Sequence, residues 1–261
     1  MHYLNHSFKR IVNCKFKLGI ITFFYFAAIG TFFLNSGMQY FSVGGTPRIG
    51  DYMTFLAIGS GSKFFQMVVL WFLPLMLMLV FCDEFAEDFT TGYKNVLITK
   101  IGKGKYIVKS ILKTFLFSFL MFLSMLLLNW LFTDIAMDGA TATVFDDVLP
   151  YYRDRTWFVY SFYHPKLINL CYIIATSLIA GVVGGSCAAL FIAFHNRKIV
   201  YPVGFLPWFI AFNMKKSITM ALQPFTEYSL RSLLPIYIIT VAAYILMGTV
   251  SVVKVIKYDL V

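Results

Sequence analysis

Apolar residues are gathered into six charge-free runs that are separated by shorter polar connections. A helix of about 20 apolar residues crosses the hydrocarbon core of a bilayer. The pattern therefore predicts an all-α, polytopic membrane protein with six transmembrane helices in a single domain over residues 1–261. The six runs cover residues 18–34, 64–82, 114–133, 167–194, 199–214 and 232–253.

Prolines disturb two of these predicted spans. Pro74 lies in the second run and is expected to kink that helix. The fifth run is short and contains Pro202 and Pro207, each of which lacks a backbone N–H. This segment is expected either to cross the membrane as a kinked helix or to enter it only partway.

Three segments outside the runs are expected to lie at the membrane surfaces. Residues 1–17 mix apolar and basic side chains at helical spacing, which indicates an interfacial helix; a plain basic flank is the alternative. Residues 214–234 are predicted to dip back into the outer leaflet as a re-entrant segment between the fifth and sixth spans. Segment 133–166 is acidic and ends in an aromatic stretch typical of anchors at the lipid headgroups. The alternative for that stretch is an outer gate, formed by Tyr151, Tyr152, Trp157 and Phe158.

Composition supports the membrane assignment. The chain is 59% hydrophobic and 13% charged, whereas soluble domains are about 45–50% apolar and about 25% charged. Membrane lipid is therefore the expected surroundings. The net charge of +10 does not indicate nucleic acid, because the basic residues flank the apolar runs and form no continuous stripe.

The distribution of charge predicts the topology. If the N-terminus is inside, the inner segments carry 14 of the 22 basic residues, and the outer segments carry 7 of the 12 acidic ones. Because lysine and arginine are enriched in cytoplasmic loops, both termini are predicted to lie inside the cell.

Small residues recur every four positions in the fourth run. This spacing lets helix backbones approach closely in lipid. Packing against another helix of the same chain is the preferred interpretation, and a seam between two subunits is the alternative. The residues concerned are Ser177, Gly181, Gly184, Gly185 and Ala188.

The chain lacks the motifs of several classes of membrane transporter and membrane enzyme. No G-x-x-x-x-G-K-[ST] nucleotide-binding motif occurs, and the runs contain no Asp, Glu, Lys or Arg to couple transport to ions. No Ser/His pair, His-Glu motif or cluster of Cys and His indicates an enzyme or a metal site. We therefore expect no enzyme activity and no cofactor or metal in this chain. A transporter without a motor of its own would receive work from a soluble partner through an inner loop.

The inner loop after the second run reads "EDFTTGYKNVLITKIGKGKYIVKSIL". It resembles the cytoplasmic segment of six-span, type-2 permeases of ATP-binding-cassette (ABC) exporters. In that family an acidic residue precedes a Gly by a few positions, followed by an apolar patch, a short turn and a Lys that opens the third span. The turn at 102–105 is Gly-Lys-Gly-Lys here, whereas the family usually has Ser-Arg. The matching positions are Glu87, Asp88, Gly92, residues 94–98 and Lys109.

The resemblance implies a coupling helix that docks on a separate ABC ATPase subunit, which would hold the ATP and Mg. A solvated loop whose lysines only set the topology is the alternative. A side-chain repeat every four residues would give this helix one apolar edge, with two acids beside it. The implied coupling residues are Phe85, Glu87, Asp88, Phe89, Gly92, Tyr93, Lys94 and Leu97.

The function implied is that of a single permease domain in the bacterial cytoplasmic membrane. Paired with a second permease, identical or related, it would export an amphiphilic substrate, with a peptide as the leading candidate. The alternative function is a non-transporting membrane scaffold or immunity protein that binds a peptide or another partner.

Overall fold

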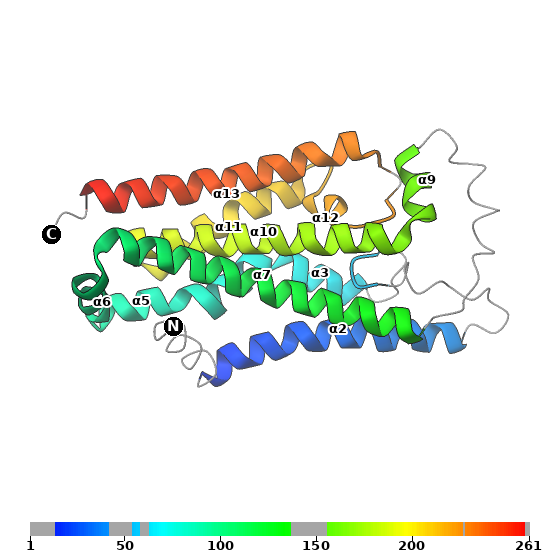
Figure 1. Cartoon of the computed structure of the whole chain (residues 1–261), viewed down its shortest axis with the longest axis horizontal. Coiled ribbons are helices and arrows are strands. Elements are labelled where there is room, and N and C mark those ends of the chain that lie inside the picture. Colours follow the sequence, from blue (N-terminus) through cyan, green and yellow to red (C-terminus); the bar gives the residue numbers. More distant parts are fainter. Residues whose placement is uncertain (1–13, 42–53, 58–62, 137–155, 227, 259–261) are drawn as a thin grey trace.

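Long helices that run back and forth along one axis make up most of the chain (Figure 1). The computed structural model describes residues 14–41, 54–57, 63–136, 156–226 and 228–258. The elements are α2 (Lys15–Phe41), α3 (Lys63–Trp71), α4 (Leu73–Leu77), the π-helical turn η2 (Met78–Cys82), α5 (Asp83–Thr90), α6 (Tyr93–Ile101), α7 (Lys103–Ala136), α9 (Thr156–Tyr163), α10 (Pro165–Phe194), α11 (Arg197–Asn213), α12 (Ile218–Ala221) and α13 (Leu230–Tyr258).

Within the part of the chain that the structure describes, four helices are long and apolar enough to cross a membrane. A fifth candidate is the second predicted span, which is one broken segment of α3 followed by α4, η2 and α5, bent by 63°. The bend falls at Phe72, two residues before Pro74, so the predicted kink is confirmed. The protein is thus an α-helical membrane protein with four to five candidate spans. The four unbroken ones cover Lys15–Leu34, Lys103–Ile135, Pro165–Phe194 and Leu230–Lys257.

The fifth apolar run forms α11, a helix of 17 residues that continues through both Pro202 and Pro207. This segment is therefore helical throughout. A crossing by α11, and with it the count of six spans, stays a prediction.

Helix α10 is the centre of the bundle. Of its apolar stretch, 83% is buried inside the protein, compared with 22% to 39% in the other three unbroken candidate spans. The small residues explain this burial, because helix α7 approaches their backbone closely. A methyl group at Gly181 would lie 2.9 Å from the Phe115 ring, and one at Gly184 would lie 2.9 Å from Cβ of Ser118.

The stripe of small residues therefore packs within the chain. Ser177 and Ala188 are buried as well, and Gly185 faces Ile111 and Phe115 of α7. This face of α10 is occupied by α7, and a seam between subunits would have to use another surface.

The two ends of the bundle differ. Helix α6 lies across one end, where α13 also finishes, and α9 lies at the opposite end (Figure 1). In α9, Trp157 stacks on Tyr160 and Phe158 is buried against Phe162. Tyr151, Tyr152 and most of the predicted interfacial segment, residues 1–13, lie outside the described residues.

The predicted re-entrant segment contains the four-residue helix α12. Ile218 and Leu222 are completely buried, and Phe225 packs near Phe162. The segment therefore folds back against the helices; its depth in a membrane stays a prediction.

Candidate functional site

Four carboxylates on α5 lie at the end of the bundle that α6 crosses. Asp83 and Glu87 are one helical turn apart and face Arg197, the first residue of α11. The Arg197 Nε lies 2.6 Å from Oδ1 of Asp83, and Arg197 Nη2 lies 3.8 Å from Oε1 of Glu87. This face of α5 is therefore held to α11 by charge.

The neighbouring face of α5 carries Glu84 and Asp88, again one turn apart, and both are buried. Glu84 forms an ion pair with Lys113 of α7, and the exposed fractions of the two side chains are 4% and 3%. The Lys113 ammonium also lies 4.9 Å from the centre of the Phe85 ring. Because a buried charge is strongly unfavourable alone, this pair holds α5 against α7.

Gly92 separates α5 from α6. Its φ of +72° lies in the left-handed region, which glycine adopts without steric strain. The hydroxyls of Thr90 and Thr91 donate to the Glu87 carbonyl at 3.0 and 2.8 Å, and they close the end of α5. The chain therefore turns at this glycine, and α6 takes a new direction across the bundle (Figure 1).

This turn corrects one sequence interpretation. The repeat of Phe85, Phe89, Tyr93 and Leu97 would form one edge only in a helix that continued through position 92. In the structure Phe85 and Leu97 are buried inside the chain, Tyr93 is half-buried, and Phe89 is half exposed. The four side chains therefore do not present a common edge.

The turn between α10 and α11 packs against the turn between α5 and α6. His195 ends α10 with a φ of 52°, and its ring stacks on Phe89 at 4.0 Å. Lys94 Nζ lies 2.7 Å from His195 Nε2 and 5.5 Å from the Phe89 ring centre. Lys94 and one side of Phe89 are thus engaged within the chain.

The surface left open at this end comes from the outer sides of α5 and α6. It includes three of the predicted coupling residues, Glu87, Phe89 and Gly92, while Asp88 is 4% exposed. Val96, which is 47% exposed, lies within the matching stretch 94–98 but was not among the implied coupling residues. We call the following set the α5–α6 surface: Glu87, Phe89, Gly92, Asn95, Val96, Thr99 and Lys100.

Sequence reasoning also missed the residues that hold α5 in place. Asp83, Glu84, Lys113, His195 and Arg197 were not candidates. A signal existed in the acidic pattern "DEFAED", whose spacing gives two pairs of carboxylates one turn apart. Their basic partners are 29 and 114 residues away in the sequence, so local spacing could not identify them.

A metal centre is not indicated in the described segments. No group of three or more His, Cys, Asp or Glu side chains there has the arrangement to hold a metal ion.

Comparison with known proteins gives one relationship over most of the chain. This chain is 32% identical over 214 residues to "Uncharacterized protein YybM" of Bacillus subtilis (strain 168). The matched region covers 82% of this chain and 83% of that protein. The chain belongs to the YybM family. No family model and no solved structure matches the chain.

Proposed function

We propose that this protein is the membrane subunit of an ABC exporter and that the α5–α6 surface docks a separate ATPase subunit. One observation carries the proposal: the short helix α6 lies across one end of the bundle (Figure 1), and apolar and charged side chains of α5 and α6 are exposed there. Phe89 and Val96 are each about half exposed there. Such side chains at a polar end suit contact with another protein.

The contacts of α5 supply a way for force to enter the bundle. A partner that displaces α6 would also displace α5, which is tied to α7 through Lys113 and to α11 through Arg197. Removing one member of a buried ion pair costs about 3–5 kcal/mol. The helices would therefore move together rather than separate at Lys113.

Helix α11 extends this connection toward the opposite end. Trp208 of α11 donates to the Leu70 carbonyl of α3 at 2.8 Å, and Tyr244 of α13 donates to the Gly204 carbonyl of α11 at 2.8 Å. Both side chains are buried. In this proposal α11 crosses the membrane as the fifth of six spans, and it links the α5–α6 surface to α3 and α13.

The proposed complex contains two permeases, identical or related, and two ATPase subunits that bind ATP and Mg. The proposed cargo is amphiphilic, because the candidate spans offer apolar surface and few charges. A peptide is the leading candidate for this cargo. The proposed direction, out of the cytoplasm, rests on the resemblance of the segment after the second span to the cytoplasmic segment of ABC exporter permeases.

Co-purification from the native membrane tests the proposal. The full chain carries an affinity tag, and ATP hydrolysis by the recovered complex is measured in lipid. Phe89→Ala combined with Val96→Arg should reduce recovery of the ATPase about tenfold, as for loss of interface residues worth ~1.4 kcal/mol. Membrane insertion should not change, since both side chains are about half exposed and lie outside the apolar spans.

Phe64→Ala is the matched control. Phe64 is 71% exposed and belongs to α3, which begins far from α6, so ATPase recovery should equal that of the unmodified chain. An unmodified chain that recovers no ATPase would contradict the proposal and favour the scaffold or immunity function. Equal losses in the Phe64 variant and the double variant would also contradict it.

A further inference from the structure

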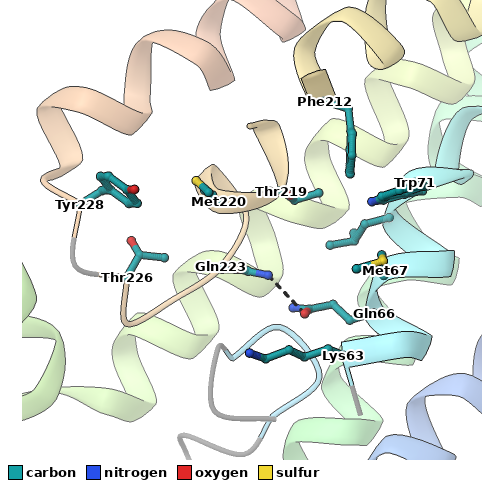
Figure 2. A pocket seen from close by; sticks show the side chains of 11 residues that line it. Lys63, Gln66, Met67, Trp71, Phe212, Thr219, Met220, Gln223, Thr226 and Tyr228 are labelled. Carbon is teal, nitrogen blue, oxygen red and sulfur yellow. Dashed lines mark hydrogen bonds between the residues drawn. The ribbon is translucent and has the colours of Figure 1, made fainter. Parts of the chain in front are cut away.

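A cavity of about 460 Å³ lies away from the α5–α6 surface, between α3, the end of α11, α12 and the segment that follows α12 (Figure 2). Its size falls within the ~300–1,000 Å³ of ligand pockets in proteins. The proposed docking of an ATPase makes no use of it. The residues that line it are Lys63, Gln66, Met67, Leu70, Trp71, Phe212, Thr219, Met220, Gln223, Thr226 and Tyr228.

One wall of the cavity is a single face of α3. The lining positions 63, 66, 67, 70 and 71 follow the spacing of one side of a helix. This face is polar at its start and apolar further along. Lys63 and Gln66 lie in its first turn, and Met67, Leu70 and Trp71 follow them.

The polar part of the cavity is built from fixed side chains. Gln66 is buried, and its Nε2 donates to the Leu56 carbonyl at 2.9 Å. The Nε2 of Gln223 donates to Oε1 of Gln66 at 3.2 Å (Figure 2). Among the described residues that line the cavity, Lys63 alone carries a charge.

The apolar part lies on the other side. Trp71 meets Phe212 edge to face, with the ring centres 4.6 Å apart, whereas Lys63, Gln66 and Gln223 gather opposite them (Figure 2). Met67 and Trp71 are 49% and 40% exposed, so this part of the cavity opens at the side of the helices.

We propose that the cavity binds a single-chain amphiphile with an anionic head group. The head group lies at the Lys63 ammonium beside the Gln223 amide, and the chain follows Met67 and Leu70 to Trp71 and Phe212. Cation and amide donors suit a carboxylate or phosphate, and the apolar face of α3 suits a hydrocarbon chain.

The charge of the residues that line the cavity and the length of its α3 wall favour a lipid anion over a peptide as the occupant. The described lining has no carboxylate to receive an amino terminus or a basic side chain. Lys63 and Trp71 are eight residues apart on α3, or about 12 Å along the helix axis. That separation corresponds to one acyl chain of medium length.

A brominated fatty acid tests the site in the full-length protein in neutral lipid nanodiscs. The probe is 11-bromoundecanoate, whose bromine quenches tryptophan fluorescence at short range. With its carboxylate at Lys63, the bromine reaches Trp71, so quenching should saturate. Trp71→Phe should remove most of the quenchable signal, although the chain keeps three of its four tryptophans.

Charge dependence is tested with Lys63→Gln and with the methyl ester of the same acid. The variant should bind the acid about tenfold more weakly, as expected for one charge-assisted contact. It should bind the ester as the unmodified protein does. Lys216→Gln is the matched control, because Lys216 is an exposed lysine near α12 that does not line the cavity.

Three results would overturn the inference: no saturable quenching of Trp71, equal affinity of the unmodified protein for acid and ester, or equal losses in the two lysine variants. Displacement of the acid by an amphiphilic peptide at lower concentration than by undecanoate would make the occupant a peptide and overturn it too. Binding needs no ATPase, so this outcome and that of the co-purification are independent.

Discussion

Glu84 and Lys113 show how one buried ion pair can define the arrangement of two helices, α5 and α7. Glu84 lies in the first turn of α5, directly after the π-helical turn that ends the second predicted span, and Lys113 lies ten residues into α7. Neither charge reaches solvent. A buried pair is weak evidence of net stability, but it strongly penalises any arrangement in which its members separate.

Removing one member of this pair should therefore destabilise the protein more than removing both. We expect Lys113→Met to lower the free energy of unfolding by about 3–5 kcal/mol, because it leaves the Glu84 carboxylate buried and alone. Glu84→Met combined with Lys113→Met should recover most of that loss, since two apolar side chains then meet. Unfolding in detergent micelles, followed by circular dichroism, measures both.

Arg197→Gln is the comparison for this experiment. The Arg197 side chain is 51% exposed, and a solvent-exposed ion pair contributes only about 0–1 kcal/mol. A larger loss for Arg197→Gln than for Lys113→Met would show that the buried pair is not what holds α5.

At the scale of elements, the close approach of α7 and α10 organises the bundle. Gly184 faces Ser118, and Gly181 faces the ring and backbone of Phe115. Gly185 faces Ile111 and the Cβ of Phe115. With little hydrophobic force between helices in lipid, such contact depends on van der Waals packing of small residues. The approach leaves no room for a side chain at position 184.

Gly184→Ala should therefore destabilise the protein by about 1–3 kcal/mol through overpacking. Adding Ser118→Gly should recover part of the loss because it removes the atoms that the new methyl group meets. The Ser118 hydroxyl has no hydrogen-bond partner within the described residues, so its removal breaks no bond there. Thermal unfolding in the same micelles gives the comparison.

Gly19→Ala in α2 is the matched control. No atom outside its own helix turn lies within 4 Å of the added methyl group, so the change should be neutral or stabilise by up to about 1 kcal/mol. Equal stability of the Gly184→Ala and Gly19→Ala variants would contradict the close approach of α7 and α10 at position 184.

At the scale of the whole molecule, the two ends of the bundle carry different features: the α5–α6 surface at one end and the cavity toward the other. Helices α5 and α6 and the end of α13 lie together, whereas α12 and the end of α11, which border the cavity, lie toward α9 (Figure 1). With the predicted topology, the docking surface is cytoplasmic and the Lys63 side of the cavity faces the outer membrane surface. The direction of α11 is decisive for this arrangement, because it connects the two ends.

Single cysteines in a background without the four native ones should test that topology. Asn95→Cys in α6 and Lys257→Cys near the end of α13 should react with an impermeant thiol reagent only from the cytoplasmic side. Lys216→Cys, just after α11, should react only from the outside. Reaction of Lys216→Cys from the same side as Asn95→Cys would mean that α11 does not cross the membrane.

The sequence alone determined the class of the protein, the positions of its long helices and the kink at Pro74. These features depend on local properties: long apolar runs reveal lipid as the solvent, and a proline acts on its own helix. The charged segment after the second span was also recognised from sequence, and its location on the inner side stays a prediction. Its internal geometry was not, because the left-handed turn at Gly92 broke a repeat that had been read as one helical edge.

Only the tertiary structure decided which charged side chains are buried and which are open. Asp88 and Glu87 are neighbours in the sequence, yet one is buried against other helices and the other lies at the surface. Glu87 faces Arg197 of α11, a neighbour that spacing along the sequence cannot identify. The amphiphile cavity has the same origin: α3 supplies one wall and residues 212–228 the other, and only the folded bundle places them face to face.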